Sequence, residues 1–372
     1  MRLVGVTRVA PGTVLARDVH TGRNGWAPLL RRGVVLDRKR LSALERAGIH
    51  AVYIDDDLGA GIEVPQALSD EVREAATEAL GIAFDRILEG GADDTRGVPP
   101  ESACELSEIA QRIADEIAGC GDAVLALQDL AAADSYALQH SIDVTAVGLL
   151  VGRRYLWDYG WIDHHGERRY DKIDRRLVQL GLGLMLHDVG KLTIPTEVLT
   201  KQGELDEVEL ELMRRHPLAG LDLLTSAAIS PLARVAVRSH HERWDGKGYP
   251  DGKAGEEIHQ FARIAAVADT YDAVTSERSH RRAGPPHEGW HLVVEGAGTA
   301  FDPDVVESFK RVVAPYPPGS EIVLDDGRRA VVVTMENRRF DQPRVRVGWD
   351  EHGNEVTPYE LDLDGLPQSR AA

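Results

Sequence analysis

Residues 187–191 read HDVGK, and residues 240–250 read HHERWDGKGYP. The stretch from Leu184 to Asp272 that contains both runs carries imidazole and carboxylate side chains suited to divalent metals: His187, Asp188, His216, His240, His241 and Asp269. A single zinc site needs about three or four protein ligands. Six such groups therefore suggest two ions that share a bridging ligand.

Helical spacing predicts where the first of these groups lies. Leu177, Leu180, Leu184 and His187 recur at steps of three and four residues, which puts His187 on a buried helix face near the helix end. Gly190 is expected to break that helix.

Local capping signals place the other groups. A helix is predicted over 206–215, with Asp206 as N-cap and Glu209 completing a capping box, and His216 follows it. Another helix begins at Ser230-Pro231 and delivers His240-His241 at its end. Asp269 and Asp272 lie one turn apart on a further helix. The candidate ligands thus come from four helices and converge inward, as in bundle metal sites.

These motifs resemble those of HD-GYP domains, a subclass of the HD-domain phosphohydrolases. HDVGK fits the HD-x-G-K signature, HHERWDGKGYP fits HHExxDGxGYP, His216-Pro217 with Gly220 fits HPxxG, and Asp269 with Asp272-Ala273 fits the xxDxxDA element. The resemblance covers residues 125–315. It implies a helical domain that hydrolyses cyclic di-GMP to linear pGpG, GMP or both in second-messenger signalling.

The resemblance also implies roles for the metal ligands. Asp188 is the expected bridging carboxylate; His187 and Asp269 complete one ion, and His216, His240 and His241 hold the other. Two ions about 3.5–4 Å apart clamp an in-line displacement at phosphorus, with bridged hydroxide as the nucleophile. Iron is the expected metal, with manganese or zinc as alternatives. His140 is expected at the metal pocket. Tyr136 stands where members with a third ion have an acidic residue, so two ions are favoured.

Several residues are expected to meet the substrate. Lys191 is predicted to touch only the phosphate or the leaving 3′-oxygen, to which it would give a proton. By resemblance, the substrate-binding set is completed by Arg243, Tyr249, Asp272, Arg278 and Arg281. The family usually reads R-P-Y-R/K where this chain has Arg278-Ser279-His280-Arg281, so this loop departs from the pattern.

Changes of composition along the chain predict four parts. Residues 1–62 form a small α+β accessory module, 63–122 are linker helices, 123–315 are the catalytic domain, and 316–372 are a small β module resembling an SH3 barrel. Together with the resemblance, this division implies a mainly α fold class, an HD-type helical bundle with two small terminal modules. The linker helices are expected to pack on the bundle; a stalk or homodimer seam is the alternative. Residues 153–176 are expected to form a surface loop whose aromatic side chains flank the active-site mouth.

Composition limits the partners. The net charge of −18 over 372 residues argues against DNA binding. Two cysteines and the lack of a secretory or membrane-spanning apolar run favour a cytoplasmic protein. Two alternatives stay open: a cyclic di-GMP-responsive adaptor that contacts a signalling protein through Gly248-Tyr249-Pro250, and an HD phosphohydrolase acting on a mixed cyclic nucleotide.

Overall fold

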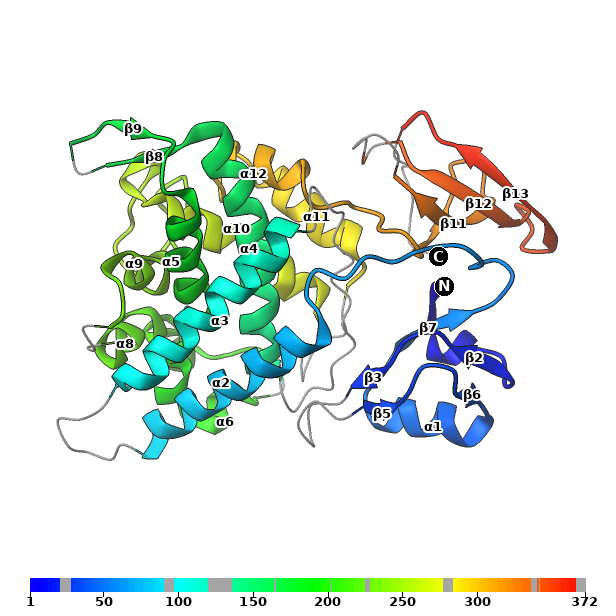
Figure 1. Ribbon diagram of the computed structural model, residues 1–372, viewed down its shortest axis with the longest axis horizontal. Coiled ribbons are helices and arrows are strands. Elements are labelled where there is room, and N and C mark those ends of the chain that lie inside the picture. The colour runs from blue at the N-terminus through cyan, green and yellow to red at the C-terminus, as the bar shows by residue number, and fades with distance from the viewer. Residues whose placement is uncertain are drawn as a thin grey trace.

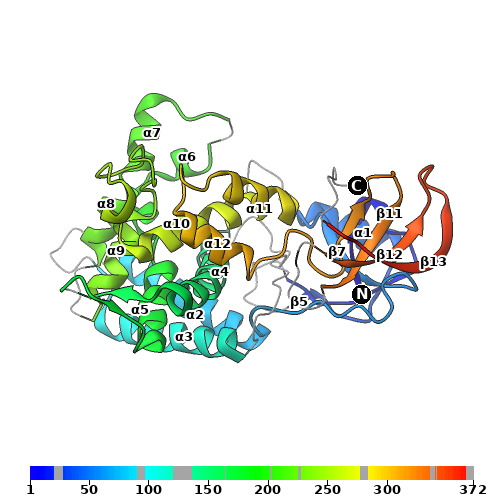
Figure 2. The same cartoon turned by 90° about the horizontal axis from the view of Figure 1, so that it is seen from above.

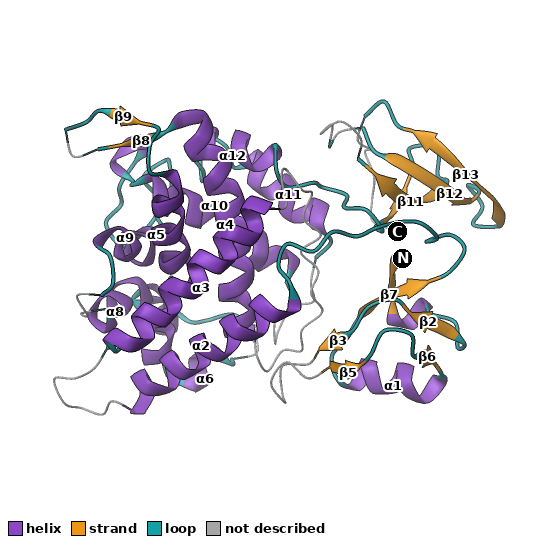
Figure 3. Ribbon diagram, in the orientation of Figure 1, coloured by secondary structure: helices purple, strands orange, loops and turns teal. Residues whose placement is uncertain are grey.

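The computed structural model describes residues 1–20, 28–89, 97–119, 136–163, 165–201, 203–224, 228–276, 284–335, 340 and 342–365. Figure 1 shows a helical lobe beside a smaller β-rich lobe that is built from the N-terminal and C-terminal parts of the chain. Figure 2, turned by 90°, shows the same separation. The mainly helical fold with small terminal β modules agrees with the sequence-based prediction, and Figure 3 displays this division of helix and strand.

The N-terminal module is a small α+β unit. Its sheet has the order β1-β7-β2-β6, and a helix and a separate strand pair accompany it. The bounds are β1 Arg2–Gly5, η1 Val6–Arg8, β2 Thr13–Leu15, β3 Val19–His20, β5 Pro28–Leu30, β6 Val35–Leu36, α1 Arg38–Arg46 and β7 Ala51–Asp55. The Asp37 side chain caps α1 by accepting a hydrogen bond from Arg40 N. Gly48 follows the helix with φ 78°, which suits glycine.

The C-terminal module is an antiparallel sheet with the strand order β10-β11-β12-β13. Its strands are β10 Glu321–Val323, β11 Arg329–Thr334, β12 Arg344–Trp349 and β13 Glu355–Asp362. Ile322, Ala330, Val345 and Val347 form its core.

The two terminal modules share a hydrophobic core. Tyr53, Leu58, Ile62 and Val64 from the N-terminal part pack with Val331 of β11. Polar contacts join the same surfaces, since one guanidinium nitrogen of Arg346 donates to the Leu58 and Ala60 carbonyls at 2.9 and 2.7 Å. Segments nearly 300 residues apart therefore form one β-rich lobe.

The helical lobe has one continuous core to which α2, α3, α4, α5, α9 and α10 all contribute. Its elements are α2 Asp70–Glu89, α3 Pro100–Gly119, α4 Tyr136–Tyr159, α5 Ile173–Met185, η3 Val189–Thr193, α6 Thr196–Leu199, α7 Glu207–Arg214, α8 His216–Leu223, α9 Pro231–Ser239, η4 Gly255–Glu257, α10 Gln260–Thr275, α11 Pro286–Glu295 and α12 Pro303–Lys310. The linker helices α2 and α3 thus pack on the bundle, as expected, and the domain boundaries themselves stay predictions.

Local signals in the sequence shape the helices that carry the site. The Asp206–Glu209 capping box is present at the start of α7. Ser230 caps α9 by accepting from Leu232 N. Close helix packing depends on small residues, because a Cβ added at Gly183 would lie 2.8 Å from the Ala233 carbonyl oxygen. That contact holds α5 tightly against α9, and a histidine of the candidate site follows the end of each helix within two residues.

The insertion after α4 is more ordered than the predicted loop. α4 continues to Tyr159, and the strand pair β8 Trp161–Ile162 and β9 Arg168–Arg169 follows. This hairpin lies at the far end of α4 from His140 (Figure 1), so its aromatic residues do not flank the histidine cluster. No helix among the described residues is long and apolar enough to cross a membrane.

Candidate metal centre

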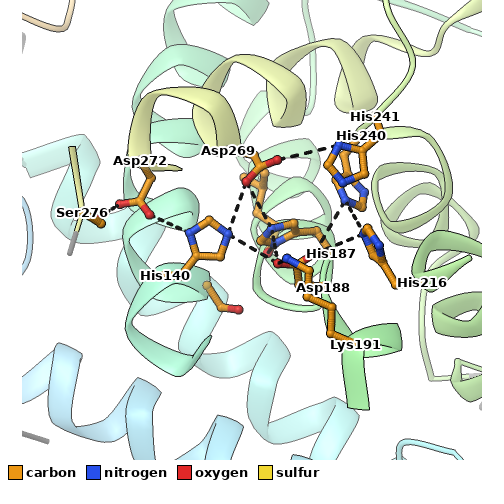
Figure 4. Close-up of polar contacts among 12 residues, drawn as sticks. His140, His187, Asp188, Lys191, His216, His240, His241, Asp269, Asp272 and Ser276 are labelled. Atoms are coloured by element: carbon orange, nitrogen blue, oxygen red, sulfur yellow. Dashed lines mark hydrogen bonds and ion pairs between the residues drawn. The ribbon is translucent and has the colours of Figure 1, made fainter. Parts of the chain in front are cut away.

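The predicted ligands meet in the interior of the helical lobe (Figure 4). They come from the ends or middles of separate elements: His140 from α4, His187 and Asp188 from the turn after α5, His216 from the start of α8, His240 and His241 from the turn after α9, and Asp269 from α10. His140, His187, His216 and His240 are each at most 2% exposed. The expected convergence from several helices is therefore what the structure shows.

The ligand atoms fall into two neighbouring groups. Asp188, His216, His240 and His241 form one, and His140, His187 and Asp269 form the other; within each group the candidate ligand atoms lie within 4.8 Å of one another.

Asp188 stands between the two groups. Its Oδ1 is 3.3 Å from His216 Nε2, whereas its Oδ2 is 3.5 Å from His187 Nε2 and 3.4 Å from His140 Nε2. His140 Nε2 also lies 3.2 Å from Asp269 Oδ1, so His140 is a full member of the cluster.

Backbone carbonyls fix how these imidazoles face. His187 Nδ1 lies 2.7 Å from Leu184 O, His216 Nδ1 lies 2.7 Å from Met213 O, and His240 Nδ1 lies 3.0 Å from Val237 O. A carbonyl can only accept, so each Nδ1 carries the proton and each Nε2 presents a lone pair to the interior. His216 Nε2 and His240 Nε2 are 3.2 Å apart. Two lone pairs this close favour a cation beside them.

The protonation states suit a metal. Burial lowers the pKa of His216 and His240 to about 4 and also lowers the pKa of His187. Burial by itself would raise the pKa of Asp188, but the positive charge of Lys191 outweighs it and holds that pKa well below its usual range. Metal ligands must be neutral imidazoles and ionised carboxylates. Buried His187 Nε2 and Asp188 Oδ1 also have no hydrogen-bond partner among the described residues, so the donor set fits divalent ions.

Lys191 occupies a different position from the one predicted. Its Nζ lies 2.5 Å from Asp188 Oδ2, three residues earlier in the chain. The expectation that Lys191 touches only the phosphate or the leaving group is therefore corrected, because its ammonium directly neutralises the proposed bridging carboxylate. Lys191 is also 34% exposed, so its side chain borders solvent.

Asp272 is also placed differently. It was expected to contact the substrate, but it is 2% exposed, and both its oxygens are engaged within the protein. Its Oδ2 lies 2.6 Å from His140 Nδ1, and its Oδ1 accepts from Ser276 Oγ at 2.7 Å. Asp272 is therefore a positioning residue that orients His140, an arrangement usual behind metal-binding histidines. Its spacing of one turn from Asp269 was the sequence signal for this role.

The loop after His241 packs against the cluster. The Tyr249 ring stacks on His241 with centroids 4.7 Å apart, and burial raises the pKa of its hydroxyl. Arg243, a predicted substrate contact, pairs with Asp245 at 2.8 Å and is 42% exposed.

Glu242 is a residue that sequence reasoning missed: it is 3% exposed and accepts from the Asp251 and Lys253 amides. A carboxylate directly after two buried histidines was the signal for it.

Three other predicted positions cannot be placed. Arg278 and Arg281 lie outside the described residues, as does the side chain of Tyr136. Their predicted roles in substrate binding and in the choice between two and three ions stay predictions.

Residues 168–305, which contain all of the cluster except His140, match the family model described as HD domain. This chain is thus similar to HD-domain proteins over that segment. It is 29% identical over 356 residues to the cyclic di-GMP phosphodiesterase PA4108 of Pseudomonas aeruginosa, covering 89% of this chain and 81% of that protein.

Two further relatives match shorter parts of the chain. The response regulator RpfG of Xanthomonas campestris, also a cyclic di-GMP phosphodiesterase, is 44% identical over 34% of this chain and 34% of its own length. A 3′3′-cGAMP-specific phosphodiesterase of Vibrio cholerae is 34% identical over 46% of this chain and 38% of its own length. The similarity to cyclic di-GMP phosphodiesterases that the motifs predicted is thereby confirmed.

Proposed function

We propose that this HD-domain protein is a metal-dependent phosphodiesterase that hydrolyses cyclic di-GMP to linear pGpG, GMP or both. The observation that carries the proposal is the placement of Asp188 between two groups of buried ligand atoms, with a different oxygen facing each group. The similarity to PA4108 over most of both chains supports the choice of substrate.

Two divalent ions fit these groups. We assign His187, Asp269 and the nearby His140 to one ion, His216, His240 and His241 to the other, and Asp188 as the ligand shared by both. Iron, or alternatively manganese or zinc, suits imidazole and carboxylate ligands. When bound, such a pair lowers the pKa of water and neutralises charge on phosphate oxygens.

The surrounding residues position the substrate. Lys191 lies at the solvent border of the cluster, and its ammonium is in place to meet a phosphate oxygen and to protonate the leaving 3′-oxygen. The Tyr249 ring covers His241 and limits the entry of water on that side. Glu242 fixes the loop that carries Tyr249 through its two backbone acceptor contacts.

A mixed cyclic dinucleotide is the second candidate substrate, favoured by the likeness to the cGAMP-specific relative. An adaptor that contacts a signalling protein through Gly248-Tyr249-Pro250 is the non-enzymatic alternative. Homodimer formation and a cytoplasmic location stay predictions.

Turnover by anaerobically purified protein separates these functions. Metal content is measured first, and cyclic di-GMP and 3′3′-cGAMP are then supplied in parallel, with products resolved by chromatography. Faster conversion of cyclic di-GMP by protein with two ions per chain is expected. Preference for 3′3′-cGAMP would overturn the choice of substrate, and binding without turnover by fully loaded protein would favour the adaptor.

A further inference from the structure

A cavity of about 530 Å³ lies where the β8–β9 hairpin meets the start of α5. Trp161 and Ile162 of β8, Arg169 of β9 and Arg176 of α5 are among its walls. An adjoining cavity of about 230 Å³ shares Trp161 and Arg176 with it and adds Arg175. The combined space has the size of a site for a small-molecule ligand.

This cavity is separate from the histidine cluster. α5 begins beside it and ends just before His187, so the eleven residues from Arg176 to His187 put roughly 16 Å of helix between the two sites. α4 likewise carries His140 near its start and reaches the hairpin only after its last residue. None of the candidate metal ligands lines either cavity.

The walls carry cations that lack acidic partners. Lys172, Arg175 and Arg176 line the two cavities, and none of them has a carboxylate oxygen within 4.0 Å among the described residues. Asp163 also lines the larger cavity, but it is engaged by Arg169 at 2.9 Å and by backbone amides. Asp171 is the other acidic residue of the wall. The two cavities are thus lined by four cationic side chains and two carboxylates, a local excess of positive charge in a chain whose net charge is −18.

The geometry holds these cations in place. The Arg176 guanidinium sits over the Trp161 ring, 3.6 Å from its centroid, while Trp161 Nε1 donates to Asp171 O at 2.8 Å. Burial lowers the pKa of Arg176 and the neighbouring Arg175 charge lowers it further, while the charge of Asp171 opposes this shift in part. The positive charges of Arg175 and Arg176 thus repel each other, and an anion bound beside them would reduce this repulsion.

The backbone at Lys172 and the His259 ring also favour an anion in this cavity. Lys172 has φ 56°, the one non-glycine residue with positive φ in the described part of the chain, and such strain recurs at ligand-binding sites. It immediately precedes α5, whose first amides have no side-chain cap. His259 Nδ1 accepts from Phe261 N, so the neutral ring carries its proton on Nε2 and is a donor in the cavity wall.

We propose that this cavity binds a phosphorylated small molecule of mononucleotide size, with Lys172, Arg175 and Arg176 holding the phosphate. Arginine and lysine side chains and free helix amides are the groups that bind phosphate in proteins. Because α5 runs from this cavity to His187, a ligand here lies on the helix that positions the HD motif. The site stands whether or not the proposed phosphodiesterase activity is correct.

Calorimetric titration of the full chain with GMP, and separately with inorganic phosphate, tests the proposal. Lys172→Gly removes a charge and suits the observed φ, so the fold is preserved. Arg175→Gln removes a second charge. Lys310→Gln is the matched control, because Lys310 is an exposed lysine of α12 paired with Glu307. Asp188→Ala tests whether the histidine cluster is the binding site instead.

GMP is expected to bind at one site per chain, with affinity reduced roughly tenfold by Lys172→Gly or Arg175→Gln, the effect of losing one charged contact. Lys310→Gln and Asp188→Ala are expected to bind as the wild type does. Tighter binding of GMP than of inorganic phosphate identifies a nucleotide, and equal affinities identify a simple phosphate site. No binding at millimolar ligand, unchanged affinity in both cavity variants, or loss of binding in Asp188→Ala would each overturn the proposal.

Discussion

Replacing Arg73 with Met should strongly destabilise the helical lobe. Arg73 of α2 and Asp143 of α4 form an ion pair at 2.7 Å, and their side chains are only 3% and 8% exposed. Gln139, the residue before His140, also donates a hydrogen bond from its Nε2 to Asp143 Oδ2 at 2.9 Å. Removing one partner breaks this buried ion pair and leaves the other charge in the interior, which costs about 3–5 kcal/mol. The change thus acts one helical turn from the candidate metal centre.

A double-mutant cycle measures this effect. Urea unfolding followed by circular dichroism at 222 nm reports the helical lobe, and the cycle compares Arg73→Met, Asp143→Leu and the double variant. Each single change is expected to lower the free energy of unfolding by about 3–5 kcal/mol, because each strands one charge. The double variant is expected to recover most of that loss, since neither charge remains.

Arg112 provides the matched control. It pairs with Glu71 between α3 and α2 at 3.1 Å, but the two side chains are 41% and 87% exposed. Arg112→Met should cost less than about 1 kcal/mol. If Arg73→Met costs no more than Arg112→Met, or if the losses of the single variants simply add in the double variant, the buried pair does not hold α2 to α4 as argued.

Three further predictions concern the site and the lobes. Asp188→Ala should lose both bound metal and activity. The Lys191 ammonium neutralises Asp188, so Lys191→Ala should slow turnover about 10²–10⁴-fold and also change metal affinity. Metal analysis and product chromatography measure both variants, and unchanged turnover in Lys191→Ala would contradict its role. The folded-state pKa of His216 and His240 is about 4, so the unfolded chain gains protons first as the pH falls. Metal-free protein should therefore lose stability between pH 6.5 and 4, seen as a falling urea midpoint, and a flat profile would refute this. A chain that lacks residues 316–372 should keep its helicity and bound metal, but its shared apolar core should be exposed and bind more of a hydrophobic dye. Loss of metal with intact helicity would show that the metal site does not lie in the helical lobe.

Much of the site could be predicted because its signals are local. The capping box at Asp206 and the Pro after Ser230 determine where α7 and α9 begin, and the histidines follow from where those helices end. The burial of His187 followed from helical spacing alone. Side-chain pairing was harder to predict: Lys191 can reach either solvent or Asp188, and only the packed turn decides between them.

Long-range features left no signature in the sequence. β8 and β9 are two residues each, too short for any alternation to mark them as strands. The contact of Leu58 and Ala60 with Arg346 joins segments nearly 300 residues apart, and no local preference encodes such a partner. The same reason explains why the cavity beside Trp161 could not be foreseen, because its wall combines β8, β9, α5, α9 and the residue before α10.

The core shared by the two terminal modules bears on how the protein emerges from the ribosome. Tyr53, Leu58, Ile62 and Val64 are made early, but Val331, which covers them, is made only after the entire helical lobe. The apolar face of the nascent N-terminal module therefore stays exposed to solvent while the helical lobe is synthesised. We expect chaperones to engage this module during translation, and the β-rich lobe to be the last part of the chain to become protected from protease.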